Sequence, residues 1–294
     1  MSERPIAFLT RPVYVPKPWG GRRLATELAR RGLPEGPIGE AWEASDLDEA
    51  PTRVDGGALD GARLSEALGR AFPLLAKVID AREDLSVQVH PDGRDGPAAK
   101  EEAWVALGDG GAVAVGLNAD ASGPGAAPRP WLDRLERARL TGASNAPSRP
   151  PTLVHVPAGT VHAILAGSLV WEVQTPVDVT WRLDDYGRMG LDGRPRALHR
   201  SEAAGVLARG PEAPSGVEPG GLKLRGRRFG MTLLPPGTHQ GLKACLAFLP
   251  AGGRFSGAGA ASGFDVPAAR TVVLTPRATA VTSPGWVFLA QAPA

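Results

Sequence analysis

Three short apolar segments follow one another between residues 152 and 175, written TLVHV, TVHAI and SLVWEVQT, with only small turns between them. In each segment hydrophobic and polar residues alternate, which is the pattern of a β-strand whose two faces meet different surroundings. Similar segments recur along the chain, and its 38 glycines and 29 prolines are scattered between them without a period, as turn residues are. This succession of short strands predicts a mainly β protein.

Helical spacing is confined to a few short stretches. It predicts helices over residues 22–32, 62–72 and 201–210, the last of which is ended by Gly210. A further helix is expected over WLDRLERARL, which follows Pro130. These helices would decorate the β body.

The composition of the chain changes at two places, which suggests a division into domains. Residues 118–151 are rich in Ala, Gly and Pro, and we interpret them as an insertion. Residues 211–221, PEAPSGVEPGG, are the best candidate for a linker. The sequence thus predicts a first domain over residues 1–210 and a smaller C-terminal β domain over residues 222–294.

The charge of the chain is nearly balanced, with 33 basic and 31 acidic residues and a formal net charge of +2. No charge imbalance points to nucleic acid or to an anionic membrane as a partner. Cys245 is the single cysteine, which excludes an internal disulfide and fits a reducing compartment. The first residues lack the apolar core of a signal peptide, and no apolar run is long enough to span a membrane. We expect a cytoplasmic protein.

Lysine is scarce in this chain, which uses arginine for most of its positive charge. Because arginine serves as the generic cation, each lysine is a candidate for a specific task, although chance placement at the surface remains the alternative. The five lysines are Lys17, Lys77, Lys100, Lys223 and Lys243.

The segment LSVQVHP carries Ser86, Gln88 and His90 on one face of a predicted strand and apolar residues on the other. A lone histidine on such a strand is more often a core residue with a satisfied hydrogen bond than a ligand. Here Glu102 begins the next strand, and His162 follows the turn PAG. Two imidazoles, one carboxylate and one amide oxygen from three neighbouring strands form a candidate site for a divalent metal such as zinc.

Two further charges stand out. In SLVWEVQT, Glu172 shares one face of the strand with Gln174, and a carboxylate buried there is costly unless it has a cation or a function. A salt bridge to Arg182 would satisfy Glu172 without any function. Lys100 could likewise be a solvated loop charge beside Glu101.

Several motifs together are similar to those of one enzyme family. The pattern PxGxxH at residues 157–162 resembles the second cupin motif, and QVHP followed by E-x-W resembles the first motif as modified in type I phosphomannose isomerases. Over residues 12–207 the chain resembles the short bacterial branch of that family. The matching runs are KPWGG, IGEAWEAS, FPLLAKVIDA, DLSVQVHP, KEEAW, VPAGTVHAI, WEVQTPVDVTWRLDDYGR and RALH.

The resemblance implies a fold and a reaction. The fold would be a cupin, a jelly-roll β-barrel with helical decorations, followed by a degenerate cupin-like C-terminal β domain. The activity would be that of a zinc-dependent aldose–ketose isomerase, which interconverts mannose 6-phosphate and fructose 6-phosphate through a cis-enediolate. The partner would be a small sugar phosphate, and we expect a monomer or a homodimer.

The resemblance also implies a role for each candidate residue. It makes Gln88, His90, Glu102 and His162 the ligands of one Zn²⁺ per chain, or of another divalent metal, and Lys100, Glu172 and Arg182 the catalytic residues. Substrate would contact Ser86, Trp19 and Arg188, with Arg194 and Arg196 as alternatives to the last. The loop at Pro91-Asp92-Gly93 and the run Pro176-Val177-Asp178 depart from the family pattern, so substrate fit is open.

Three alternatives remain at this point. The same barrel could isomerise another sugar, or it could bind a sugar phosphate without turning it over. An oxidative iron cupin is a weaker alternative, because such sites usually present a His-rich face with open positions for oxygen.

Overall fold

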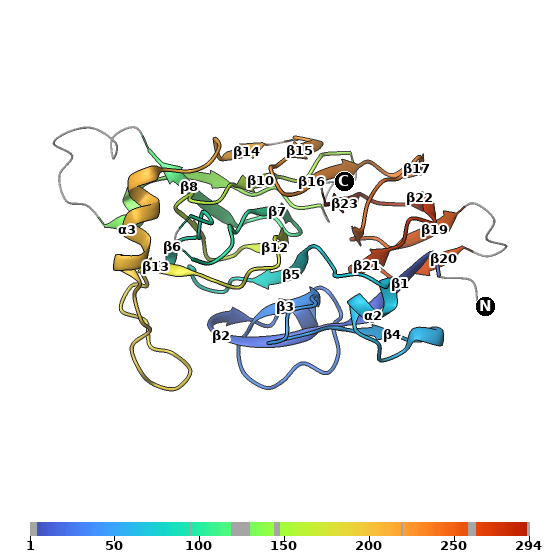
Figure 1. Cartoon of the computed structure of the whole chain (residues 1–294), viewed down its shortest axis with the longest axis horizontal. Helices are drawn as coiled ribbons and strands as arrows, with labels where there is room; N and C mark the ends of the chain where they lie inside the picture. The colour runs from blue at the N-terminus through green and yellow to red at the C-terminus, as the bar shows by residue number, and fades with distance from the viewer. Residues whose placement is uncertain are drawn as a thin grey trace.

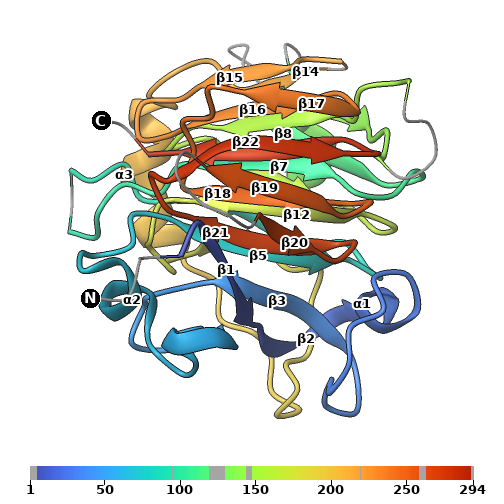
Figure 2. The ribbon, with the colours of Figure 1, turned by 90° about the vertical axis from the view of Figure 1, so that its right-hand side faces the viewer.

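Four antiparallel β-sheets form the body of the protein, and they are numbered here along the stack that they form. The structure is a computed structural model, and it describes residues 5–94, 96–118, 130–143, 148–218, 220–257 and 263–292. In Figure 1 the sheets follow one another from α3 (Arg200–Arg209) on the left to β19 and β20 on the right. Figure 2 looks along the stack, with the last sheet in front. The expectation of a mainly β fold is confirmed.

The strands of each sheet are given in spatial order. Sheet 1 contains β13 (Trp181–Asp184), β6 (Val87–Val89), β11 (His162–Ile164), β8 (Ala112–Leu117) and β9 (Leu135–Arg139). Sheet 2 contains β14 (Gly216–Glu218), β10 (Leu153–Val156), β7 (Glu102–Ala106), β12 (Leu169–Gln174), β5 (Leu75–Asp80), β3 (Ile38–Ala44) and β2 (Val13–Gly21).

The other two sheets lie beyond sheet 2. Sheet 3 contains β15 (Lys223–Arg225), β16 (Gly230–Leu234), β23 (Val287–Gln291), β18 (Leu246–Leu249), β21 (Arg270–Leu274), β1 (Ala7–Arg11) and β4 (Arg53–Asp55). Sheet 4 contains β17 (Gly237–Gln240), β22 (Ala278–Ser283), β19 (Gly253–Gly257) and β20 (Phe264–Val266).

Side chains point alternately to the two faces of each strand, so each pair of neighbouring sheets encloses its own core. On β12, Trp171 points to sheet 3 and packs near Phe248, with tilted rings whose centroids are 5.8 Å apart. Val170 on the same strand points the other way, into the apolar cluster between sheets 1 and 2. Between sheets 3 and 4 the buried side chains include Leu249 and Phe255. Sheet 2 therefore has a hydrocarbon face towards sheet 3 and a different, partly polar face towards sheet 1.

The helices are short and lie outside the sheets. α3 covers the outer face of sheet 1, and the expectation of a helix over residues 201–210 is confirmed. α1 (Arg23–Thr26) is much shorter than the expected 22–32, and Ala29, within the expected helix, has a left-handed conformation with φ of 52° that no helix contains. The expected helix at 62–72 is reduced to α2 (Leu64–Leu68), and a 3₁₀ turn, η1, spans Gly57–Leu59.

The expected helix over WLDRLERARL is wrong. Only the turn η3 (Trp131–Arg134) is helical, and the following residues form β9, which pairs with β8. Pairing with β8 and burial of Leu135 outweigh the helical propensity of the segment.

The predicted domain boundaries stay a prediction, and two strand pairings cross them. β1, near the N-terminus, pairs with β21 in sheet 3, so the first strand joins the C-terminal part of the chain. β14 lies within the predicted linker and pairs with β10 in sheet 2. None of the helices that the structure describes is long and apolar enough to cross a membrane.

Candidate metal centre and cavity

A polar cavity of about 220 Å³ lies between sheets 1 and 2. Sheet 2 supplies side chains from β2, β3, β5, β7 and β12, and sheet 1 supplies them from β6, β11 and β13. The lining residues are Lys17, Trp19, Glu40, Lys77, Ile79, Leu85, Ser86, Gln88, Lys100, Glu102, Ile164, Glu172, Asp178, Thr180, Arg182 and Arg196. Most of the expected site residues are therefore brought together here.

Two buried histidines face one carboxylate beside this cavity. His90 Nε2 lies 3.1 Å from Glu102 Oε1, and His162 Nε2 lies 3.5 Å from Glu102 Oε2. The Nδ1 atom of each ring is 2.9 Å from a backbone carbonyl, that of Val179 for His90 and that of Thr160 for His162. A proton on Nδ1 satisfies these carbonyls, so each Nε2 presents a lone pair to the carboxylate.

Protonation of the two rings is disfavoured. Burial, together with the neighbouring His90, lowers the pKa of His162 to about 3. Burial also lowers the pKa of His90, although Glu102 acts in the opposite direction. Burial would raise the pKa of Glu102, but His90 and Lys100 hold it well below its ordinary value. At neutral pH two neutral imidazoles and one carboxylate therefore converge, all of them as acceptors.

These acceptors fit a divalent cation. Their ligand atoms all lie within 4.8 Å of one another, and Glu102 Oε2 is buried without a hydrogen-bond partner. A buried acceptor without a donor is costly, and a metal with N and O ligands would satisfy it. Lys100 Nζ is 2.6 Å from Glu102 Oε1, the oxygen that also lies near His90, which leaves Oε2 beside His162 for a metal.

Gln88 completes the group. Its Nε2 is 3.2 Å from His162 Nε2, and its Oε1 accepts a hydrogen bond of 3.1 Å from Ser86 Oγ. A half-turn of the amide would exchange these two ends, and the Ser86 hydroxyl could then accept from the amide nitrogen. Gln88 is thus placed to offer an oxygen to the same centre.

Glu172 lies in a row of residues across sheet 2. Strand register places it opposite Lys77 on one side and Trp104 on the other. Trp104 Nε1 donates to Glu172 Oε2 at 2.8 Å, and Lys77 Nζ is 3.9 Å from Oε1. A salt bridge from Glu172 to Arg182 alone does not account for its position. Burial, reinforced by the charge of Glu102, raises the pKa of Glu172 to about 7.

Lys77 is the centre of a buried charge network that sequence reasoning did not assign to the site. Its Nζ is 3.2 Å from Asp178 and 3.7 Å from Glu40, and it lies over the ring of Trp42 at 4.6 Å. Burial would lower its pKa, but Glu40 and Glu172 raise it above the ordinary value.

Glu40 is the second carboxylate of that network. It also pairs with Lys17 at 3.1 Å and accepts from Trp42 Nε1 at 2.8 Å. Burial acts to raise its pKa, yet Lys77 and Lys17 lower it to about 2. The scarcity of lysine in the sequence could have predicted that Lys77 belongs to the site, because three of the five lysines, Lys17, Lys77 and Lys100, line the cavity.

Of the four expected arginines, two line the cavity, Arg182 and Arg196, and two do not, Arg188 and Arg194. Arg182 lines it from β13, and its buried Nε has no hydrogen-bond partner. Its backbone N–H donates to His199 Nδ1 at 3.2 Å, which fixes the strand at this point. Arg196 also lines the cavity, and it pairs with Asp185 at 2.9 Å. Arg188 is not among the lining residues and instead pairs with Asp185 at 3.4 Å.

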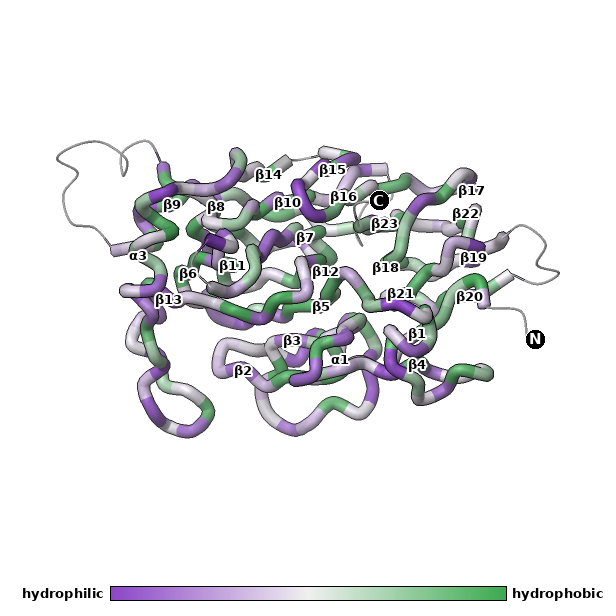
Figure 3. The backbone as a smooth tube through the Cα atoms, viewed as in Figure 1, coloured by the Kyte–Doolittle hydropathy of each residue, from purple (hydrophilic) through white to green (hydrophobic). Residues whose placement is uncertain are grey.

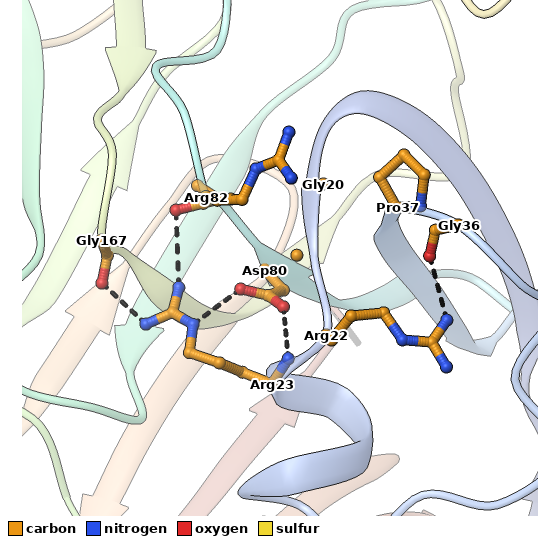
Figure 4. Close-up of a pocket in the computed structure, with 10 residues that line it drawn as sticks. Gly20, Arg22, Arg23, Gly36, Pro37, Asp80, Arg82 and Gly167 are labelled. Atoms are coloured by element: carbon orange, nitrogen blue, oxygen red, sulfur yellow. Dashed lines mark hydrogen bonds and ion pairs between the residues drawn. The ribbon is translucent and has the colours of Figure 1, made fainter.

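Another cavity, of about 690 Å³, lies beside the turn at Gly20 and Gly21. Figure 4 shows its ion pair, in which Arg23 binds Asp80 at 2.7 Å and also reaches the carbonyl of Gly167. Arg22 is turned towards the carbonyl of Gly36. The guanidinium groups of Arg22 and Arg23 bind these internal partners. This larger cavity therefore lacks the cluster of polar side chains that face one another in the smaller one.

Comparison with known proteins agrees with this geometry. The sequence profile described as the phosphomannose isomerase type I catalytic domain matches residues 11–109. The chain is 32% identical over 239 residues to the mannose-6-phosphate isomerase ManA of Bacillus subtilis (strain 168), an alignment that covers 73% of this chain and 70% of that protein. It is 30% identical over 233 residues to the mannose-6-phosphate isomerase of Streptococcus mutans serotype c (strain ATCC 700610 / UA159), which covers 71% and 70%.

A solved structure has the same fold. The crystal structure of the mannose 6-phosphate isomerase from Bacillus subtilis superposes with a TM-score of 0.77 at 23% sequence identity. The superposition covers 97% of this chain and 99% of that one. The arrangement of sheets described above is therefore the arrangement found in that crystal structure.

Proposed function

This chain belongs to the type I phosphomannose isomerase family and is by homology a mannose-6-phosphate isomerase, and from that premise we propose that it interconverts mannose 6-phosphate and fructose 6-phosphate with one bound Zn²⁺. One observation carries the proposal. A cluster of buried acceptors fit for a divalent metal reaches a small cavity through Glu102, and the same cavity is lined by Glu172, a carboxyl with a pKa of about 7.

The metal would be held by His90, Glu102, His162 and the amide oxygen of Gln88. When bound, a divalent cation supplies positive charge for the oxygens of an enediolate, which carry the negative charge of that intermediate. The buried, unpartnered Oε2 of Glu102 supports this assignment. Zinc suits two imidazoles with two oxygen ligands.

The proton transfer would be the task of Glu172. The reaction removes a proton from one of the carbons C1 and C2 and returns it to the other, so it needs a group that gains and loses a proton near neutral pH. A carboxyl with a pKa of about 7 meets that requirement. Lys100, 2.6 Å from Glu102, is the alternative proton carrier.

The phosphate would be held at the end of the cavity lined by Arg182 and Arg196. The partnerless Nε of Arg182 and the hydroxyl of Ser86 can donate to phosphate oxygens. Arg196 is preferred to Arg188, since only Arg196 lines the cavity. Buried Trp19 would form an apolar wall beside the sugar. The free Cys245 fits a reducing compartment such as the cytoplasm.

The test is a coupled assay for conversion of mannose 6-phosphate to fructose 6-phosphate, run on purified protein before chelation, after chelation and after zinc is restored. We expect activity that disappears with chelation and returns with zinc. A metal-loaded protein that binds mannose 6-phosphate without exchanging its C2 proton would instead be a sensor. Turnover of another aldose with none of mannose 6-phosphate would refute the proposed substrate.

A further inference from the structure

We propose that a third cavity, here called the arginine pocket, binds a phosphate monoester. It has a volume of about 490 Å³ and lies where β2 of sheet 2 meets β1, β4 and β21 of sheet 3. It shares no lining residue with the cavity between sheets 1 and 2. The lining residues are Arg11, Pro12, Tyr14, Leu28, Ala29, Arg30, Arg31, Asp55, Pro267, Ala268 and Arg270.

Two arginines of this pocket, Arg30 and Arg270, are largely buried, and each has an N–H donor without a hydrogen-bond partner. Arg30 is only 7% exposed, and its Nη2 donates to both carboxylate oxygens of Glu43 at 3.0 and 2.8 Å. Its buried Nε has no hydrogen-bond partner, and the same holds for Nε of Arg270. A buried N–H without an acceptor is costly, and a bound oxyanion would supply one.

The charge around the pocket favours an anion. Arg11 pairs with Asp55 at 3.3 Å and also contacts Asp60. Arg31 is exposed and has no ion pair with any residue that the structure describes. The pocket has four arginines, Arg11, Arg30, Arg31 and Arg270. Three carboxylates lie near them, those of Asp55, Asp60 and Glu43, so the net charge is +1.

Two of the pocket's arginines follow residues with a left-handed backbone conformation. Ala29 and Ala269 have φ values of 52° and 56°, which are unfavourable for a residue with a side chain. They precede Arg30 and Arg270 directly. Of the described residues other than glycine, Tyr186 alone shares this conformation. Two of these three residues therefore directly precede arginines that line the pocket.

Phosphate is the oxyanion that best suits this arrangement. The planar guanidinium group donates in a fork that matches phosphate oxygens, and several forks from different directions suit a terminal phosphate group. The remaining wall is apolar, with Leu28, Pro12 and Pro267, and Tyr14 adds an aromatic ring. The expected ligand is therefore a phosphate monoester with a small organic group.

The two tyrosines of the chain provide a reporter for each cavity. Tyr14 lines the arginine pocket, whereas Tyr186 donates its hydroxyl at 3.0 Å to the carbonyl of Leu85, which lines the other cavity. Full-length protein labelled with 3-fluorotyrosine should give two ¹⁹F resonances, which the variant Tyr186→Phe assigns. Inorganic phosphate and glycerol 3-phosphate are then titrated separately at constant ionic strength.

We expect the Tyr14 resonance to shift and saturate with both probes. Arg31→Glu should weaken this binding by about tenfold, equivalent to about 1.4 kcal/mol. Arg227→Glu makes the same charge change at an exposed residue of another surface and should have no such effect. The Tyr186 resonance reports whether each variant is folded.

Three results would overturn the proposal. The Tyr14 resonance could stay fixed while that of Tyr186 moves, which would place phosphate only in the cavity between sheets 1 and 2. It could move linearly without saturation, as in a general salt effect. Equal affinities in Arg31→Glu and Arg227→Glu would also exclude the arginine pocket as the site.

Discussion

The gap between sheets 1 and 2 and the gap between sheets 3 and 4 each contain an apolar cluster between antiparallel strands, but the first also contains buried charged residues. The first encloses Lys77, Glu102, Glu172 and two histidines. The second holds hydrocarbon, including Leu249 and Phe255. β18 has only hydrophobic residues and is coloured so in Figure 3. The sequence of β12 contains the hydrophilic residues Glu172 and Gln174.

The comparison separates stability from chemistry. Burial of charged groups costs desolvation free energy, and their mutual attraction offsets only part of that cost. A charged interior therefore contributes little to the free energy of folding. Burial of apolar side chains is the main favourable contribution to folding. We infer that the gap between sheets 3 and 4 stabilises the chain, whereas the gap between sheets 1 and 2 performs the reaction. The predictions below test this division.

The largest effect is expected from His162→Ala. Loss of one imidazole should release the metal and remove several kcal/mol of transition-state stabilisation, so activity should fall by about 10³-fold or more. The measurement is turnover together with metal content after dialysis. The matched variant, His239→Ala, removes a histidine of sheet 4 and should keep both metal and activity. Full activity of His162→Ala without metal would refute the assignment.

A large effect on stability alone is expected from Phe255→Ala. This side chain is fully buried between sheets 3 and 4, and its truncation should lower the free energy of unfolding by about 3–5 kcal/mol. Denaturant unfolding measures that change, and Ser256→Ala, an exposed neighbour on the same strand, is the control. The turnover number of the folded protein should stay unchanged. A loss of turnover comparable to that of His162→Ala would break the division between the two gaps.

The smallest effect is a shift of the pH profile in Lys77→Met. Lys77 lowers the pKa of Glu172, which burial has raised to about 7. Removal of this cation should raise that pKa by about one further unit. Because the reaction needs the ionised carboxylate as base, activity should begin to fall at a higher pH as the solution is acidified. Lys77→Arg keeps the charge and should keep the profile, and an acid limb at unchanged pH in Lys77→Met would exclude Glu172 as the base.

The sequence by itself determined the residue types of the site and the faces of the strands. Alternation placed Ser86, Gln88 and His90 on one polar face, and Glu102 and His162 follow as further ligand types. Helix prediction held for residues 201–210, which pack on a sheet face, and failed at residues 135–139, which pair with a strand edge. Strand pairing depends on a neighbour that local spacing cannot identify.

The tertiary structure alone decided which of these faces meet. The ligands were expected from three neighbouring strands, but β7, which begins with Glu102, belongs to the sheet opposite β6 and β11. Strand register likewise set Lys77 beside Glu172, and loop packing turned Arg196 rather than Arg188 into the cavity. The physical reason is that alternation fixes the direction of a side chain relative to its own strand, whereas sheet order, register and stacking depend on contacts between residues far apart in sequence.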